Sequence, residues 1–329
     1  MKKSNNYFHE IVGQQKVVET LTQALNNNHI SHSYIFSGPK GTQRTRMAYS
    51  FAKALLSEGK PSYSDSSRRV EDHNHPDLIN IFPDGTSIKI KQIRDDLIKD
   101  ISIKPFESKY KIYIVHDAHT MGTPAQNALL KTLEEPPEYG IIILITNNLP
   151  VLLPTIISRS QNLQFKPLNE NIIQNYLQKR HKIEEQKARE ISIMANGSIE
   201  KAVSLCQKDN ILQEREELLQ SLLKIIKDKD VITAFSTAQY LKEHKEHLEE
   251  LLDFIMLWFR DISLYKELGK NRWIIHREYE DLLQEFSYYL SDDQINVIIE
   301  EVNISKNNMK YNVNLQLNME TMLLKMQEE

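Results

Sequence analysis

The chain has 329 residues, of which 40% are hydrophobic and 26% charged, and its formal net charge is −4. This size favours two or three domains with ordinary buried cores, and the charge balance excludes a global basic field that would attract nucleic acid. The single cysteine, Cys206, excludes an intrachain disulfide and a zinc site built from cysteines, and we expect a reducing, cytoplasmic location.

Two stretches resemble membrane-targeting segments in one respect each, and neither is expected to be one. The amino-terminal MKKSNNYFHEIVGQQ has two lysines but no apolar h-region, unlike a signal peptide. Residues 139–158 are uncharged, but Asn147, Asn148, Pro150 and Pro154 lie inside the run and would be costly in lipid. We interpret this run as a buried strand, a loop and a turn.

The first half of the chain alternates short apolar runs with helical patterns. The predicted strands are residues 33–36, 78–82, 111–115, 140–146 and 162–165, and several are continuously apolar, as is typical of strands covered on both faces. Helical patterns occupy residues 45–59, 88–102 and 123–137, the last with Thr123 as the expected N-cap. This alternation predicts an α/β domain with a mostly parallel sheet.

The pattern changes after about Pro167, because helical patterns continue to the end of the chain with almost no strand signal. Residues 57–69 (SEGKPSYSDSSRR) form the one low-complexity patch and predict an exposed loop. The later helices carry apolar stripes in which Phe254 and Trp258 are ordinary core aromatics or, alternatively, interface anchors.

The stretch FSGPKGTQRT (36–45) is close to a phosphate-binding P-loop. In a working loop, backbone N–H groups surround the phosphates, a lysine reaches the β/γ oxygens and a Ser or Thr holds Mg²⁺. Gly38, Gly41 and Thr45 are present here, but Gln43 replaces a glycine and Arg44 replaces the lysine. The loop is therefore predicted to be degenerate, with its two glycines favouring a tight strand-to-helix turn.

The strand that ends IYIVHDAH also lacks residues of a working Walker B motif. Such a strand ends with an Asp that organises Mg²⁺ and a Glu that orients the attacking water. His116 stands in the Asp position and Asp117 in the Glu position. A neutral imidazole is a poor ligand for a hard cation that prefers oxygen, so metal-assisted hydrolysis is not expected.

Six stretches together resemble the bacterial clamp-loader AAA+ family over residues 7–206. They are IVGQQKVVETLTQAL, ISHSYIFSGPKGTQRT, RRVEDHNHPDL, NALLKTLEEPP, LPTIISRS and NGSIEKAVSL. The resemblance implies an AAA+ P-loop-type parallel-sheet domain over 1–166, a small helical lid domain over 167–207 and an all-α C-terminal collar domain over 208–329.

The resemblance also assigns roles to residues outside the loop. LPTIISRS is similar to the family's SRC motif, whose arginine enters the neighbouring subunit's nucleotide site as an arginine finger. Arg159 is implied in that role, with Ser158 shaping the turn. A surface ion pair is the alternative for a lone arginine. Glu200 stands where the family's sensor 2 segment usually has an arginine, and its negative charge would repel a triphosphate.

The implied role is a subunit without ATPase activity that forms a fixed platform in an open ring. Its implied partners are the tau/gamma and delta subunits, together with the sliding clamp and primer–template DNA through the whole complex. No cofactor of its own is expected, since neighbouring subunits would bind the ATP.

No metal is expected either. The family often carries a four-cysteine zinc module, but Pro61, Ser64 and Ser67 stand where cysteines would fall, and a hydroxyl is a poor substitute for a thiolate. A metal-dependent hydrolase is a weaker alternative, built from the remaining candidate ligands His73, His75, His116, Asp117 and His119.

Two further alternatives remain open. One is an active AAA+ ATPase, which ATP turnover by the isolated chain would reveal. The other is a stand-alone DNA-binding module, for which residues 88–94 (IKIKQIR) offer only a mildly basic segment.

Overall fold

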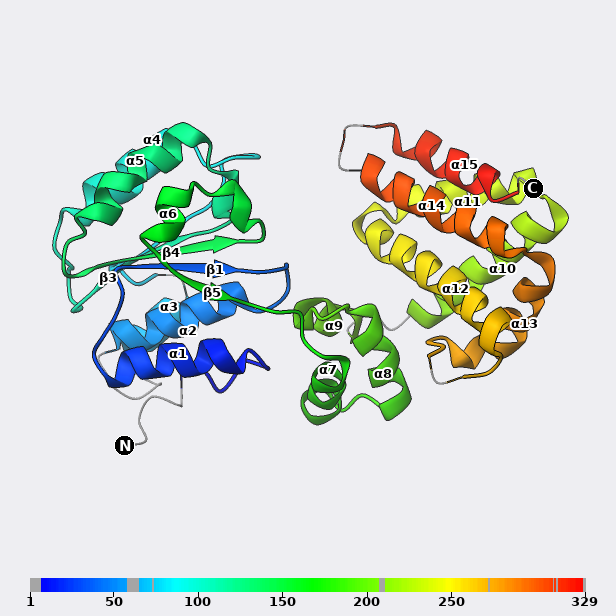
Figure 1. Cartoon of the computed structure of the whole chain (residues 1–329), viewed down its shortest axis with the longest axis horizontal. Coiled ribbons are helices and arrows are strands. Elements are labelled where there is room, and N and C mark those ends of the chain that lie inside the picture. Colours follow the sequence, from blue (N-terminus) through cyan, green and yellow to red (C-terminus); the bar gives the residue numbers. More distant parts are fainter. Residues whose placement is uncertain are drawn as a thin grey trace. The chain divides into compact units, whose positions relative to one another are not determined.

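The structure is a computed structural model of the whole chain, and it describes residues 7–57, 65–72, 74–206, 211–271, 273–309, 311 and 313–327. The chain forms two compact units (Figure 1). The first comprises Met1–Ala188 with Ala195–Val203, and the second comprises Arg189–Met194 with Ser204–Glu329. The three predicted domains stay a prediction, and their boundary at residues 207/208 lies outside the described residues.

The first unit is built on a five-stranded sheet in the order β2-β3-β4-β1-β5, and every neighbouring pair is parallel. Its strands are β1 (Ser33–Ser37), β2 (Leu78–Ile81), β3 (Lys111–Val115), β4 (Gly140–Thr146) and β5 (Gln161–Gln164). All five predicted strands and the parallel arrangement are therefore confirmed.

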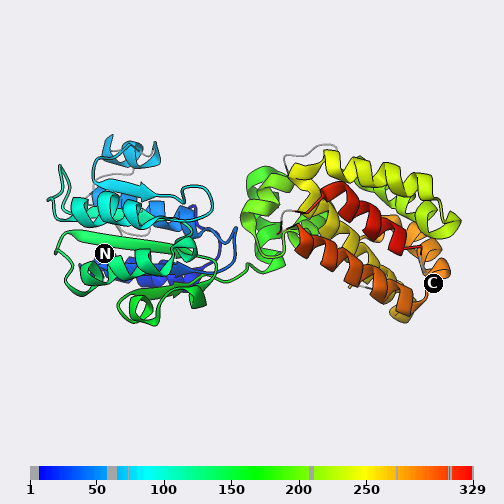
Figure 2. The ribbon, with the colours of Figure 1, turned by 90° about the horizontal axis from the view of Figure 1, so that it is seen from above.

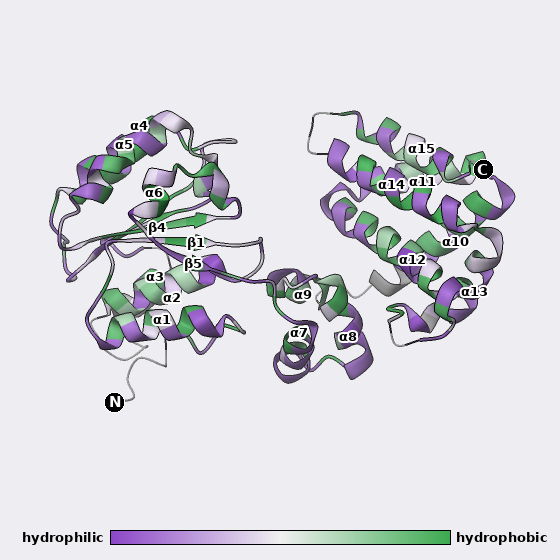
Figure 3. Ribbon diagram, viewed as in Figure 1, coloured by the Kyte–Doolittle hydropathy of each residue, from purple (hydrophilic) through white to green (hydrophobic). Residues whose placement is uncertain are grey.

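Helices cover both faces of this sheet, as the continuously apolar strands predict. Successive side chains of a strand point to opposite faces, so Tyr34 and Phe36 belong to one core cluster and Ile35 to the other. In Figure 1, α1, α2 and α3 lie on one side of the sheet and α4, α5 and α6 on the other. Figure 3 shows the hydrophobic colouring of β1 and β4 between these layers.

The helical segments of the first unit are mostly short. They are α1 (Gln15–Asn26), α2 (Arg44–Leu56), α3 (Asp65–Glu71), α4 (Ile90–Gln92), π-helical η1 (Ile93–Lys99), η2 (Ala118–Thr120), α5 (Thr123–Glu134), η3 (Leu149–Val151), α6 (Pro154–Ser158), α7 (Glu170–Tyr176) and π-helical η4 (Leu177–His181). Within residues 139–158, β4 confirms the expected buried strand, whereas the expected loop and turn contain the 3-10 helix η3 and the short helix α6.

Two local predictions are wrong. Gly122, in an extended conformation, is the N-cap of α5, and Thr123 is already its first helical residue, because Pro124 fits the first turn one position further on. The predicted exposed loop over 57–69 is also incorrect in its last part. Residues 65–69 lie in α3, where buried Ser67 faces the protein, while 58–64 lie outside the described residues.

The remaining helices are α8 (Glu185–Met194), α9 (Ile199–Cys206), α10 (Ile211–Asp228), α11 (Val231–Glu243), η5 (Lys245–His247), α12 (Leu248–Leu268), η6 (Arg277–Tyr279), α13 (Glu280–Tyr289), α14 (Asp292–Asn308) and α15 (Leu315–Lys325). In the second unit α11 packs against α15, and α12 packs against α13 and α14 (Figure 2). Phe254 and Trp258 on α12 are fully buried in this helical core, so they are core aromatics of the chain rather than anchors for a partner. Across the described ranges, no helix is both long and apolar enough to cross a bilayer.

Candidate functional site

Residues 38–43, called the P-loop here after the motif they resemble, connect β1 to α2 at the carboxyl edge of the sheet. Parallel strands end at the same edge, so this loop, the residues after β3 and those after β4 are neighbours. The Gly38 N–H donates to the carbonyl of Thr146, the last residue of β4, at 3.1 Å. A Cβ on Gly38 would lie 2.3 Å from the Phe165 carbonyl oxygen, so the close approach of these backbones requires glycine.

Gly41 fits against the start of α9. Its φ is +75°, and its carbonyl accepts the Ile199 N–H at 3.1 Å. A Cβ on Gly41 would lie 1.8 Å from the Ser198 hydroxyl oxygen. The space next to this glycine is therefore filled by the protein itself, and both P-loop glycines serve a tightly packed turn.

Gln43 takes the position of the missing glycine in a left-handed conformation, with φ of +67°. For a residue with a Cβ this conformation costs about 1–2 kcal/mol. The side chain is buried, and its Oε1 accepts the Val12 N–H at 2.8 Å, which ties the loop to the segment before α1. The Gln43 side chain thus links the P-loop to the segment before α1.

The side chain of Gln14 makes a second connection in the same place. Its Nε2 donates to the Lys166 carbonyl at 2.7 Å and to the Thr42 carbonyl at 3.4 Å, and its Oε1 accepts the Lys166 N–H at 3.2 Å. One amide therefore joins the P-loop to the chain just after β5.

Arg44 begins α2 and is 7% exposed, whereas Thr45 is exposed. Burial lowers the pKa of the Arg44 guanidinium, and the negative charges of Asp117 and Glu200 oppose that effect. The structure thus brings three of the predicted site residues into one electrostatic neighbourhood. Glu200, exposed in the first turn of α9, supplies a negative charge to it.

His116 is held in an aromatic and hydrogen-bonded cluster that the sequence did not reveal. Its ring stacks on Phe82, with centroids 4.1 Å apart and 12° between the planes. Its Nε2 lies 3.1 Å from Asn80 Oδ1 and 3.4 Å from the Tyr49 hydroxyl, which itself donates to Asn80 at 2.8 Å. Protein groups therefore surround the ring nitrogen at the position where a Walker B carboxylate would bind a metal.

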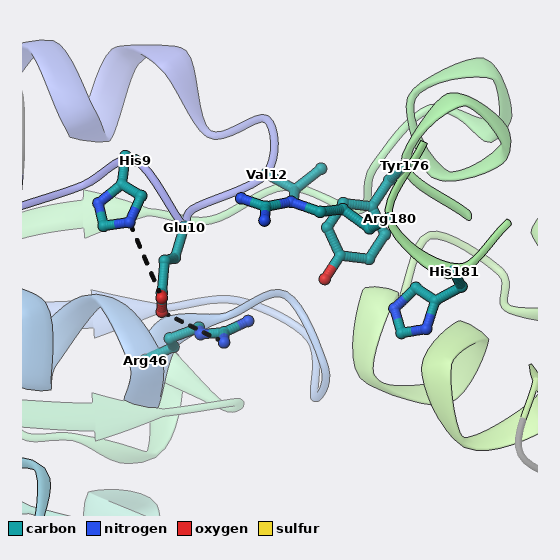
Figure 4. Close-up of a pocket in the computed structure, with 7 residues that line it drawn as sticks. All are labelled: His9, Glu10, Val12, Arg46, Tyr176, Arg180 and His181. Atoms are coloured by element: carbon teal, nitrogen blue, oxygen red, sulfur yellow. Dashed lines mark ion pairs between the residues drawn. The ribbon is translucent and has the colours of Figure 1, made fainter. Parts of the chain in front are cut away.

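A pocket with a volume of about 320 Å³ lies beside the P-loop between β1 and α2 (Figure 4). Val12, whose N–H binds Gln43, is one of its walls, and Glu10 forms an ion pair with Arg46 at 3.3 Å. The lining residues are His9, Glu10, Val12, Arg46, Tyr176, Arg180 and His181. The pocket lies between the segment before α1, the start of α2 and the α7–η4 region, which are too distant in sequence for any pattern to have predicted it.

Arg159 directly follows α6, and its side chain is 35% exposed. Its Nη2 lies 2.7 Å from Glu134 Oε1, and its Nη1 donates to the Thr155 carbonyl at 3.2 Å. The Ser158 hydroxyl donates to the same carbonyl at 3.2 Å.

Arg159 lies near the amino ends of the strands, whereas the P-loop lies at their carboxyl ends. The neighbouring Ser160 hydroxyl lies 2.7 Å from that of Ser33, the first residue of β1, whereas the P-loop starts after Ser37, the last. At about 3.3 Å per residue, these ends of β1 are about 13 Å apart. The P-loop and the partly exposed Arg159 are therefore near opposite ends of β1.

The His-Pro-Asp segment at residues 75–77 is built into the fold. The Nδ1 of buried His75 accepts the Asp77 N–H at 3.1 Å, and its Nε2 lies 3.2 Å from Glu107 Oε1. The Asp77 carboxylate accepts the N–H groups of residues 106–108 at 2.5–3.0 Å. Both side chains are thus engaged in holding a loop.

Within the described residues, no group of three or more His, Cys, Asp or Glu is placed to hold a metal ion. His73, together with Ser64 and Pro61 of the predicted zinc-module comparison, lies outside the described residues.

Comparison with known proteins identifies the family of the chain. Residues 13–169 match the family model described as DNA polymerase III, delta subunit, and residues 209–328 match the model for its C terminal part. DNA polymerase III subunit delta' of Bacillus subtilis is 33% identical over 96% of this chain and 96% of its own length. DNA polymerase III subunit tau of the same organism is 30% identical over 92% of this chain, which spans 58% of that longer protein.

Among solved structures, a DNA polymerase III gamma subunit-related protein from Thermotoga maritima is 19% identical over 94% of this chain and 98% of that chain, with a TM-score of 0.47.

The parallel sheet, the glycine loop after β1 and the helical region after β5 define the class of the chain as AAA+-like. Within that class, the chain belongs to the DNA polymerase III clamp-loader subunit family.

Proposed function

We propose that this chain is the delta-prime subunit of a bacterial clamp loader. It does not hydrolyse ATP, and it supplies Arg159 to the nucleotide site of a neighbouring subunit. The observation that carries this proposal is the separation of the two sites: the degenerate loop follows the end of β1, and Arg159, whose side chain is 35% exposed, lies beside its start.

Several contacts support the absence of hydrolysis at the chain's own loop. Phosphoryl transfer depends on positioning and on neutralising the phosphate charge. Here the loop is tied to Val12 by Gln43, the start of α9 fills the space beside Gly41, and His116 is bound to Asn80. These contacts hold the loop against the protein's own groups, and His116 offers Mg²⁺ an imidazole in place of a carboxylate.

The surface position of Arg159 supports action on another subunit. A guanidinium that is a third exposed and held by an exposed ion pair remains available to a stronger anionic partner. At a neighbour's triphosphate it would neutralise developing charge, an effect worth roughly 10³–10⁵ in rate for arginine fingers.

In this proposal the chain works in the cytoplasm with tau/gamma and delta subunits, whose complex loads a sliding clamp onto primer–template DNA. ATP is bound by the neighbours, and this chain needs neither a nucleotide nor zinc of its own. The similarity to a delta' protein over nearly the whole length of both chains supports the assignment.

Reconstitution of the complex with tau/gamma and delta tests the proposal. We expect Arg159→Ala to abolish the contribution of the adjacent site to DNA- and clamp-stimulated ATP turnover. Arg68→Ala, which removes another exposed arginine on α3, is the matched control and should leave turnover unchanged. Equal turnover for wild type and Arg159→Ala would reject the finger role.

A tau/gamma-like ATPase is the second candidate, and the 30% identity to a tau subunit favours it. ATP turnover by the isolated chain discriminates between the two, because the proposed subunit should show none above the background of a Thr45→Ala control.

A further inference from the structure

We propose that Glu134 is a positioning residue for Arg159, which holds the guanidinium ready for the neighbouring subunit's nucleotide. This inference rests on the proposed finger role of Arg159 and adds to it a second side chain of the same subunit. Glu134 is the last residue of α5, and its Oε1 lies 2.7 Å from Arg159 Nη2.

The two residues come from elements that are fastened to each other. Gln126 on α5 is 3% exposed, and its Oε1 accepts the Leu153 N–H at 2.8 Å while its Nε2 donates to the Val151 carbonyl at 3.2 Å. Leu153 is the N-cap of α6, so this buried amide fixes the start of α6 against α5. The ion pair thus joins a helix end to a short helix whose position is already set.

Three contacts hold the guanidinium. Nη2 meets Glu134, and Nη1 donates to the Thr155 carbonyl at 3.2 Å and to the Ser158 hydroxyl oxygen at 3.5 Å. Arginine has five N–H donors in a rigid fork, so these contacts leave other donors for a phosphate. A long side chain loses conformational entropy when it is fixed in one rotamer. Because Arg159 is already fixed within its own subunit, this entropy cost does not fall on its binding to the neighbouring subunit.

The ion pair between Glu134 and Arg159 is weak enough for the guanidinium to bind a phosphate of the neighbouring subunit. The Glu134 side chain is 50% exposed, and ion pairs between exposed groups contribute little to stability because water and salt screen them. A triphosphate with several negative charges is a stronger partner for the same guanidinium. Glu134 therefore orients the arginine without withholding it.

A double-mutant cycle in the reconstituted complex tests the proposal. Glu134→Ala and Glu134→Gln are made in the wild-type and Arg159→Ala backgrounds, and kcat and KM for ATP are measured with clamp and DNA present. We expect Glu134→Ala to lower kcat about threefold to tenfold with KM within twofold, and Glu134→Gln, which keeps a hydrogen-bond acceptor, to lower it less. Neither change should lower turnover further once Arg159 is alanine.

Glu135→Ala is the matched control, because Glu135 is the exposed neighbour that follows α5. It should leave kcat unchanged, and equal thermal unfolding midpoints for all variants would show that folding is intact. Unchanged or raised kcat in Glu134→Ala, while Arg159→Ala is impaired, would overturn the positioning role alone. Additive losses in the double variant would overturn it too, since Glu134 would then act independently of Arg159. Full turnover in Arg159→Ala would reject the finger role itself, and the role of Glu134 with it.

Discussion

Arg44 and Arg159 are the same kind of side chain in opposite settings within one unit. Arg44 begins α2 directly after the P-loop and is 7% exposed, with the charges of Asp117 and Glu200 near it. Arg159 follows α6 beside the start of β1 and is 35% exposed. The comparison teaches that the same charged group can be buried at one position of the unit and a third exposed at another. In the proposed function, only the guanidinium of Arg159 can reach a phosphate of another subunit.

The largest expected effect is the loss of Arg159. In the reconstituted complex, Arg159→Ala should slow the adjacent site by roughly 10³-fold or more, because the transition state loses a charge-assisted contact. Arg44→Ala should leave turnover unchanged, and steady-state ATP turnover of both complexes measures the contrast. Equal losses from both substitutions would remove the distinction between the two arginines.

A second test concerns the loop as packed structure. Gly41→Ala should lower the free energy of unfolding of the first unit by about 1–3 kcal/mol, because φ is +75° and the new Cβ would meet Ser198 at 1.8 Å. Gly85→Ala is the matched control, since its φ is +69° and no atom lies within 4 Å of the added Cβ. Urea unfolding of both variants measures the difference, and equal losses would show that packing at Gly41 contributes nothing.

Lysine at either position sharpens the comparison further. Arg159→Lys keeps the charge but loses the planar fork, so we expect about a tenfold loss at the adjacent site. Arg44→Lys restores the lysine typical of a P-loop, yet we expect no ATP turnover by the isolated chain, because Gln43 and His116 remain. Hydrolysis by the Arg44→Lys chain would contradict this.

The smallest expected effect is a pH dependence of stability. Burial lowers the pKa of His75, while the charge of Glu107 opposes that effect. The folded state then binds fewer protons than the unfolded state, so the free energy of unfolding should fall as the pH drops below about 6.5, by at most about 1.4 kcal/mol per pH unit for one proton.

Urea midpoints of the wild type and His75→Gln at pH 7.5 and 5.5 measure this dependence, and the variant should show the smaller change. His119, whose pKa burial also lowers, would account for a remaining slope of the same sign. A stability that rises on acidification would contradict the assignment of His75 as a structural, neutral group.

Strands, class and family followed from the sequence because their signals are local. Apolar runs such as residues 140–146 are fully buried strands, as their composition predicts. The N-cap of α5 was misplaced by one residue because Thr and Gly both suit that position and Pro124 tolerates either register.

The sequence predicted which residues of the candidate site differ from the motifs, but not what those residues contact. Gln43, Arg44 and His116 stand out against the motifs, whereas the residues that they contact in the fold do not. Val12 is 31 residues from Gln43, and Asn80 is 36 residues from His116. The Glu134–Arg159 pair is likewise set by how α5 and α6 pack, and no spacing rule relates these two residues.

The Gln14 side chain, which bonds to both Thr42 and Lys166, has a mechanical consequence. Because a single amide contacts both segments, a shift of one relative to the other would break these hydrogen bonds. We therefore expect the loop after β1 and the segment leaving β5 to move as one piece.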